Sequence, residues 1–245
     1  MLPRWRSGPT ELVLVRHGHS AGNAADDAAR ESGAEELDLS DRDADVALSD
    51  TGQEQAEGLA AWLSGLDPDE RPTRAVTSPY RRAADTANAA LHPLGLEPDV
   101  DERLRERDLG VFDGLTGAGI RSRHPEEAAR RKKLGKFYYQ PPSGESWADV
   151  VLRVRSLLAD VRADCDGERL WLFTHQAVIM SFRYALESLS EEEILRIDRE
   201  VMIPNASVTR YRRVDDRLEL VEFADTLHLE RSPADVTEEP ERSSA

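Results

Sequence analysis

The 245-residue chain has a single cysteine, Cys165, and only 6% aromatic residues. One cysteine excludes an internal disulfide framework and fits a reducing compartment. No apolar run in the sequence approaches the ~18 consecutive residues of a membrane-spanning helix, and residues 1–10 contain no apolar signal core. These absences predict a cytoplasmic protein without a membrane partner.

Basic residues are fewer than acidic ones. The chain has 32 Lys and Arg and 48 Asp and Glu, so its formal net charge is −16. Nucleic-acid binding requires a basic surface, so this balance argues against a nucleic-acid partner. Half of the acidic excess lies in residues 21–50, whose net charge is −8. Residues 121–136 carry a net +5 instead. Two interpretations of that segment stay open: a solvated helix face, or a cation cluster that gathers anions near a site.

Short apolar runs alternate with stretches of helical periodicity along most of the chain. Runs typical of buried strands occupy residues 12–15, 74–78 and 170–174, and helical spacing of apolar residues occurs in the segments between them. A closing pair of strands is expected at residues 207–212 and 218–223. This alternation indicates one α/β domain with a largely parallel sheet.

Four segments carry weaker local patterns. Residues 20–46 are expected to form a long loop with one helix, and residues 99–104 a strand. Residues 110–145 are rich in Gly, Pro and basic residues, which predicts irregular structure around one helix at 125–134. The polar residues 230–245 are predicted to be a disordered acidic tail.

Histidines stand at the ends of two predicted strands. Arg16 and His17 follow the run at 12–15, and His175 follows the run at 170–174. Ligands bind at the carboxyl ends of strands in open α/β sheets. An arginine there can hold two phosphoryl oxygens, and an imidazole can be a nucleophile when its second nitrogen is oriented by a hydrogen bond. One such histidine is more often structural, but two of them favour a phosphoryl site.

The remaining strand run ends at Ser78 and is followed by Arg81 and Arg82 at the start of a helix. The free backbone N–H groups of a helix N-terminus favour anions. The three strand ends therefore predict a crevice in which Arg16, one of these two arginines and both histidines surround a phosphoryl group.

Six motifs occur in the order in which one enzyme family carries them. They are Val15 to Asn23, Leu48 to Ala56, Thr77 to Ala87, Leu104 to Gly110, Pro142 to Ser146, and Thr174 with His175. Through them, residues 11–223 resemble the histidine phosphatase superfamily (branch 1), the phosphoglycerate-mutase-like proteins. The resemblance implies a single three-layer α/β/α domain with helices on both faces of the sheet. We assign residues 11–229 to that domain and residues 1–10 to an N-terminal extension.

The resemblance also implies roles for individual residues. His17 would be the nucleophile that becomes phosphorylated, in a pocket that Asn23 supports. Glu106 would protonate the leaving oxygen and then activate water, and this role calls for a raised pKa. Three residues would line the phosphate pocket: Arg16, Arg82 and His175. The arginine of the family lies four residues after the strand-end serine, which favours Arg82 over Arg81.

Two positions depart from the family pattern. Gln176, which we include among the substrate-binding residues, stands where the family usually has glycine, and His19 stands where it commonly has Glu or Gln. Both departures bear on pocket width and leaving-group preference. The pair His17 and His19 lacks the third and fourth ligands of a metal site, so no metal is expected. No cofactor is implied.

Within the superfamily, residues 105–112 and 136–146 resemble phosphatase-type members more than phosphoglycerate mutases. The resemblance therefore implies a phosphatase that hydrolyses phosphomonoesters through a phosphohistidine. The alternative is phosphoryl transfer of the cofactor-dependent phosphoglycerate mutase type, in which Arg130 to Lys133 would grip a second phosphate or a carboxylate. A pseudoenzyme that binds phosphorylated ligands without turnover is a third interpretation. The expected partner is a small phosphorylated substrate or a phosphoprotein. The sequence leaves the substrate and the oligomeric state open.

Overall fold

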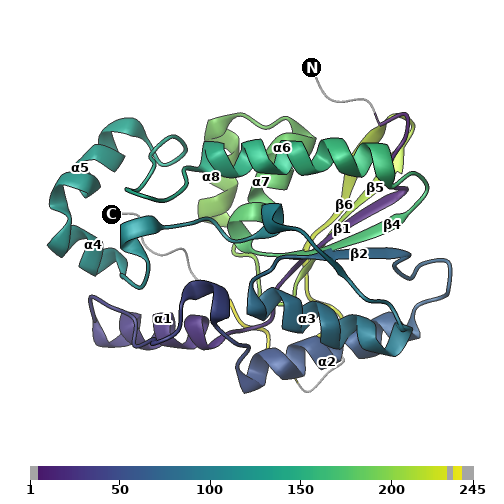
Figure 1. Ribbon diagram of the computed structural model, residues 1–245, viewed down its shortest axis with the longest axis horizontal. Helices are drawn as coiled ribbons and strands as arrows, with labels where there is room; N and C mark the ends of the chain where they lie inside the picture. Colours follow the sequence, from purple (N-terminus) through teal and green to yellow (C-terminus); the bar gives the residue numbers. More distant parts are fainter. Residues whose placement is uncertain (1–4, 231–233, 239–245) are drawn as a thin grey trace.

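A computed structural model describes residues 5–230 and 234–238. They fold around a six-stranded sheet in the order β3-β2-β4-β1-β5-β6 (Figure 1). The strands are β1 (Glu11–Arg16), β2 (Arg74–Thr77), β3 (Asp99–Val100), β4 (Arg169–Thr174), β5 (Val208–Val214) and β6 (Arg217–Asp225). Strands β1 to β4 are parallel to one another. At one edge of the sheet, β5 pairs antiparallel with β1, and β6 pairs antiparallel with β5. The predicted α/β fold with a largely parallel sheet is confirmed.

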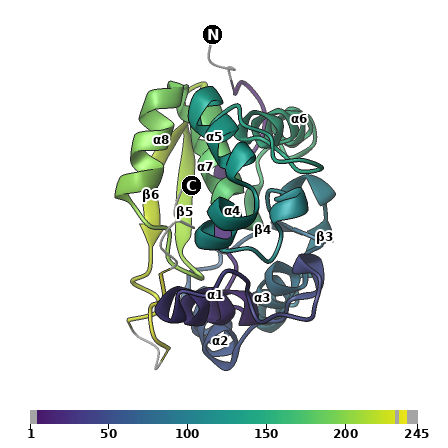
Figure 2. The same cartoon turned by 90° about the vertical axis from the view of Figure 1, so that its left-hand side faces the viewer.

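Helices cover both faces of the sheet. Helices α6, α7 and α8 pack on one face and α2 and α3 on the other (Figure 1). Helices α4 and α5 lie in front of the ends of β1 and β4 (Figure 2). The bounds are α1 (Ala21–Ser32), α2 (Asp50–Gly65), α3 (Arg81–Leu91), α4 (Gly117–Arg123), α5 (Pro125–Leu134), α6 (Trp147–Asp164), α7 (Gln176–Glu187) and α8 (Glu191–Glu200). Within the described residues, no helix is long and apolar enough to span a membrane.

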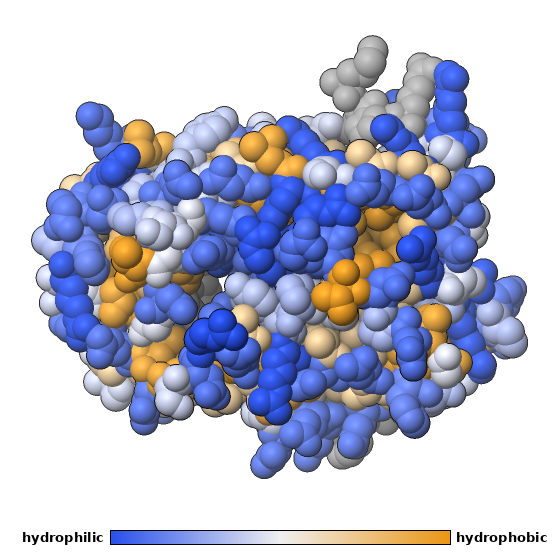
Figure 3. All heavy atoms as spheres, viewed as in Figure 1, coloured by the Kyte–Doolittle hydropathy of each residue, from blue (hydrophilic) through white to orange (hydrophobic). Residues whose placement is uncertain are grey.

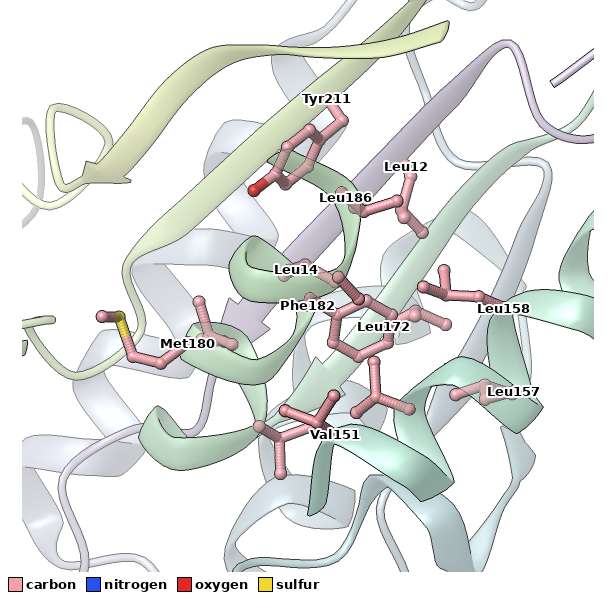
Figure 4. Close-up of a cluster of buried hydrophobic side chains, with 14 of the residues drawn as sticks. Leu12, Leu14, Val151, Leu157, Leu158, Leu172, Met180, Phe182, Leu186 and Tyr211 are labelled. Atoms are coloured by element: carbon pink, nitrogen blue, oxygen red, sulfur yellow. The ribbon is translucent and has the colours of Figure 1, made fainter. Parts of the chain in front are cut away.

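The central strands are apolar throughout because both of their faces are buried. Side chains alternate across a strand, so Leu12 and Leu14 of β1 join the core beneath α6 and α7, while Val13 and Val15 join the core above α2 and α3. All four are fully buried. Figure 4 shows the first of these cores, where the labelled side chains include Val151, Leu158, Leu172 and Phe182. The two cores hold β1 and β4 rigidly, and the site residues follow directly from their ends.

The strand expected at residues 99–104 is largely replaced by a turn. Only the two residues of β3 pair with β2, and a 3-10 helix follows at Glu102–Leu104. The cause is Asp101, whose carboxylate accepts the backbone N–H of Arg103 at 2.8 Å and caps that turn. A side chain that bonds its own backbone two residues on competes with the strand ladder.

Helix α4 is not expected from the sequence, because two of its seven residues are glycines. Tertiary contact explains it. Thr116 caps the helix by accepting the N–H of Gly119, and a Cβ at Gly119 would lie 2.0 Å from the carbonyl oxygen of Glu35. Glycine is needed there so that α4 can approach the segment after α1.

Both ends of the described chain pack on the domain. The N–H of Trp5 donates to the carbonyl of Asp216 at 2.8 Å, and the indole is buried in the core beneath α6. Contrary to the disorder expected for residues 230–245, Thr237 hydrogen-bonds both Gln55 and Asn205. Buried amide partners order this part of the tail. Residues 1–4, 231–233 and 239–245 lie outside the described structure.

Candidate active site

His17 follows β1 directly and is buried, with 3% of its surface exposed. Its Nδ1 lies 2.8 Å from the carbonyl oxygen of Gly18. A carbonyl oxygen can only accept, so this bond places the proton on Nδ1 and leaves the lone pair of the neutral ring on Nε2. Burial, together with the positive charges of Arg82 and Arg16, holds the pKa of His17 well below its ordinary value. The ring is therefore neutral at neutral pH, with its lone pair on Nε2.

The loop after His17 lies against the first turn of α2. A Cβ at Gly18 would be 2.7 Å from the carbonyl oxygen of Gly52, and one at Gly52 would be 1.9 Å from that of His19. Gly18 also donates its N–H to the hydroxyl of Thr86 in α3, at 3.0 Å. These contacts explain why glycine occurs in both motifs, and they fix the backbone that orients the His17 ring.

Arg82 lies beside His17, and Arg81 points elsewhere. The Nε of Arg82 is 3.4 Å from Nε2 of His17, and its guanidinium lies 5.1 Å from the centre of the Tyr80 ring. The other guanidinium nitrogens face Asp43, whose carbonyl and carboxylate oxygens lie 2.6 and 3.0 Å from Nη1. Arg81 is exposed and pairs with Asp85 one helical turn away. The preference for Arg82 agrees with this geometry.

His175 is fully buried beside His17. Its ring centre is 5.1 Å from that of His17, and its Nε2 is 2.9 Å from the hydroxyl oxygen of Ser78 at the end of β2. The Tyr80 ring meets it edge-on at 5.3 Å. Burial, together with the charge of Arg82, lowers the pKa of His175 well below its ordinary value. A neutral ring thus packs against the neutral ring of His17.

Arg16 and Asn23 line the same cavity as His17. Arg16 has 1% of its surface exposed and donates to the carbonyl of Ile203. The amide oxygen of Asn23 accepts the N–H of Ser20 at 3.0 Å and the side-chain N–H of Asn205 at 3.4 Å. Asn23 therefore takes part in the capping box of α1 and also lines the cavity.

Glu106 is half-buried and follows the turn after β3. Its Oε1 accepts the backbone N–H of Arg107 at 2.7 Å. Burial raises the pKa of Glu106, and the negative charge of Asp43 adds to the rise, while the Arg107 N–H and the charge of Arg82 oppose it. A carboxyl group whose pKa is raised can hold a proton for a leaving group.

These side chains open on a cavity of about 380 Å³. Figure 3 shows a hollow in this face, between the part formed by α4 and α5 and the rest of the molecule. Six of the expected site residues line the cavity: Arg16, His17, Asn23, Arg82, Glu106 and Gln176. His175 does not line it and packs on His17. His19 also lies outside the lining, and its Nδ1 is 2.8 Å from the hydroxyl of Ser49.

A second group of cations lines the far wall of the same cavity. Arg107, Arg131 and Lys136 belong to it, with Asp198 and Trp147 beside them. Lys136 pairs with Asp198, and its ammonium lies 5.2 Å from the Trp147 ring. Burial lowers the pKa of both Lys136 and Arg131.

Two features of this wall suit a further polar ligand. No carboxylate in the described structure pairs with Arg131 within 4 Å. The buried Nε1 of Trp147 likewise has no hydrogen-bond partner there. Both groups are donors only, so they can bind an oxygen of an anion or a hydroxyl.

The basic segment at 121–136 is divided between two environments. Of the four residues expected to grip a second anion, only Arg131 reaches the cavity, and Lys136 joins it from beyond the helix. Arg130, Lys132 and Lys133 are exposed on α5. The segment is therefore part cavity lining and part exposed helix face, and anion binding by it stays a prediction.

The sequence did not reveal several residues of the site. Asp43 and Asn205 lie in segments without periodicity, and only their contacts show their place. Tyr80 occurs in a quoted motif, and its position between the strand-end serine and Arg82 could have indicated it. Among the described residues, no three His, Cys, Asp or Glu side chains are grouped as metal ligands.

Comparison with known proteins identifies the family. The profile of the histidine phosphatase superfamily (branch 1) matches residues 12–226. The chain belongs to this superfamily. The bifunctional protein Rv2228c of Mycobacterium tuberculosis is 32% identical over 193 residues, which are 76% of this chain and 48% of that protein. The 6-phosphofructo-2-kinase/fructose-2,6-bisphosphatase of Gallus gallus is 31% identical over 75% of this chain and 34% of that protein. The chain thus spans about half or less of the length of these relatives.

Solved structures give whole-chain matches. Mycobacterial glucosyl-3-phosphoglycerate phosphatase Rv2419c with VO3 is 29% identical, with a TM-score of 0.70 over 89% of this chain and 100% of that one. YhfR of Bacillus stearothermophilus has a TM-score of 0.71 at 23% identity and supports the fold alone. The superfamily and these neighbours include phosphatases.

Proposed function

We propose that this protein is a phosphatase that hydrolyses phosphomonoesters through a phosphohistidine on His17. The observation that carries the proposal is the orientation of the His17 ring. The Gly18 carbonyl holds the proton on Nδ1, so the lone pair lies on Nε2, which accepts a long hydrogen bond of 3.4 Å from the Nε–H of Arg82 at the cavity. A neutral imidazole next to fixed cations is arranged to attack an anionic phosphoryl group.

In the first step, Nε2 of His17 forms a bond to phosphorus, and the bond from phosphorus to the ester oxygen breaks. Arg16 and Arg82 offset the charge on the phosphoryl oxygens. Glu106 in its protonated form, which its raised pKa favours, transfers its proton to the leaving oxygen, and the alcohol departs.

In the second step, the Glu106 carboxylate accepts a proton from a water molecule whose oxygen attacks phosphorus. The bond from phosphorus to Nε2 breaks, inorganic phosphate leaves, and His17 returns to its neutral form. In a mutase-type reaction, a substrate hydroxyl would take the place of water in this step.

The second cation group indicates the class of substrate. A phosphoryl group at His17 leaves the rest of the molecule in the cavity that Arg107, Arg131 and Lys136 line. We infer a small phosphomonoester with a second anionic group. The names of two relatives agree with this inference, since a fructose bisphosphate and a glucosyl phosphoglycerate each carry one.

Trapping the intermediate tests the proposal. Brief exposure to a phosphorus-labelled aryl phosphate should leave an acid-labile, base-stable label on the protein. His17→Ala should abolish label and turnover, whereas the exposed His92→Ala should keep both. Full activity in His17→Ala would overturn the mechanism. A phosphoenzyme discharged by a phosphoglycerate but not by water would instead establish the mutase reaction.

A further inference from the structure

A closed set of hydrogen bonds supports the loop of His17 from behind. The side-chain N–H of Asn205 donates to the carbonyl of His17 at 3.2 Å, and the amide oxygen of Gln55 accepts the N–H of His19 at 2.8 Å. Between these two amides lies the hydroxyl of Thr237. It accepts from Nε2 of Gln55 at 2.8 Å and donates to Oδ1 of Asn205 at 3.0 Å. Gln55 and Asn205 are fully buried.

The Thr237 hydroxyl joins the two amides in the orientations that they have. It accepts the NH2 of Gln55, which also donates to the carbonyl of Asp235, and it donates to the oxygen of Asn205. In these orientations Gln55 directs its oxygen to the N–H of His19, and Asn205 directs its NH2 to the carbonyl of His17. Those are the orientations that the backbone of the loop requires.

The loop in turn sets the position of the nucleophilic atom. The carbonyl that orients the His17 ring belongs to Gly18, between the two backbone groups that Asn205 and Gln55 bind. A shift of this backbone therefore rotates or moves Nε2 relative to Arg82. Reacting atoms must be held near their attack geometry, and a displacement of ~1 Å can cost ~100-fold in rate.

Thr237 does not itself line the cavity, and it lies beyond residues 12–226, which the family profile matches. Its segment is attached to the domain by two further bonds that do not use the hydroxyl. The N–H of Asn205 donates to the carbonyl of Thr237 at 2.9 Å, and Gln55 donates to the carbonyl of Asp235 at 2.8 Å. Removing the hydroxyl alone therefore leaves the segment attached.

We propose that Thr237 is a positioning residue of the phosphoryl-transfer site, acting on His17 through Gln55 and Asn205. The inference rests on the function proposed above. It assigns to the C-terminal segment a part in the geometry of the nucleophile, and it makes the hydroxyl, rather than the bulk of the side chain, the feature that matters.

Three variants test this role with an aryl phosphate as substrate. Thr237→Val keeps the shape and removes the hydroxyl, Thr237→Ser keeps the hydroxyl, and Val236→Ala alters an exposed neighbour in the same segment. We expect Thr237→Val to lower kcat by roughly tenfold or more, with KM within about threefold of the parent value, since the loss is in positioning. Thr237→Ser should restore kcat to within about twofold, and Val236→Ala should match the parent.

Thermal unfolding of each variant separates positioning from stability. All rates are measured well below the unfolding midpoint, where every variant is folded. A parent value of kcat in folded Thr237→Val would overturn the inference, and so would a loss that Thr237→Ser does not reverse. Failure of the proposed function looks different, because the parent protein itself would then neither turn over nor form the labelled intermediate.

Discussion

Arg82 binds an anion of its own chain, the carboxylate of Asp43. The Oδ1 and Oδ2 atoms of Asp43 lie 3.0 and 3.4 Å from Nη1 and Nη2 of Arg82, and the Asp43 carbonyl lies 2.6 Å from Nη1. The third nitrogen, Nε, faces Nε2 of His17 at 3.4 Å. The Asp43 carboxylate thus orients the guanidinium toward His17, and in the proposed mechanism a bound phosphoryl group competes with that carboxylate.

Neutralising Asp43 should tighten the binding of phosphate. In Asp43→Asn the competing charge is gone, and we expect the inhibition constant of inorganic phosphate to fall by about two- to fivefold. The gain is modest because the Asp43 side chain is 38% exposed, and partly exposed pairs contribute little. Asp85→Asn, which removes an equal charge from a pair with Arg81, both outside the cavity lining, is the control and should have little effect. Weaker phosphate binding in Asp43→Asn would show that orienting Arg82 outweighs the competition.

Replacing Glu106 by Gln tests whether Glu106 supplies the proton that the leaving group takes up. The amide keeps the shape but cannot transfer a proton, a role typically worth ~10²–10⁴-fold in rate. The loss of kcat/KM should be large for an alkyl phosphate and small for nitrophenyl phosphate, whose leaving group departs without protonation. Equal losses for both substrates would contradict the assignment of Glu106 as the acid.

The pH dependence of kcat/KM for an alkyl phosphate is a second test of Glu106 as the acid. Glu106 must be protonated in the first step, so kcat/KM should fall as the pH rises through its pKa. Burial and Asp43 raise that pKa, and the charges of Arg82 and Arg107 oppose the rise, so the fall should occur above the ordinary carboxyl range. The fall should be absent in Glu106→Gln.

Since Arg131 lines the cavity and Arg130 does not, their substitution should have different effects on KM. Arg131→Gln should raise KM by about tenfold for a substrate with a second anionic group and leave a small aryl phosphate nearly unchanged, because the phosphate pocket is intact. Arg130→Gln, on the exposed side of α5, is the matched control and should change neither substrate. Identical responses of both substrates to Arg131→Gln would show that Arg131 makes no contact with a distal anion.

The predicted strand ends correspond closely to the site because parallel strands deliver their ends to one edge of a sheet. Each apolar run marks where its strand stops, and His17 and His175 are the next residues. The sequence did not show that β1 and β4 are neighbours. Their register pairs Arg16 with Thr174, and this pairing brings the two histidine rings to 5.1 Å.

The local sequence pattern did not predict contacts between segments that are distant in the chain. The helix at 125–134 is expected from the sequence, yet its orientation, which turns Arg131 inward and leaves Arg130 in solvent, depends on how α4 and α5 pack over the strand ends. The polar composition around Thr237 predicts disorder, but two buried amides more than 30 residues away bind it.

By itself, the sequence determined the alternation of strands and helices, the strand ends that carry Arg16, His17 and His175, and the superfamily. These depend on periodicity and on short motifs, which are properties of neighbouring residues. Only the tertiary structure decided that Asp43 faces Arg82, that Arg131 enters the cavity, and that Thr237 supports the loop of the nucleophile. Such contacts form between segments brought together by core packing. A single buried polar side chain has no repeating pattern in the sequence, because its burial depends on the segments that pack around it.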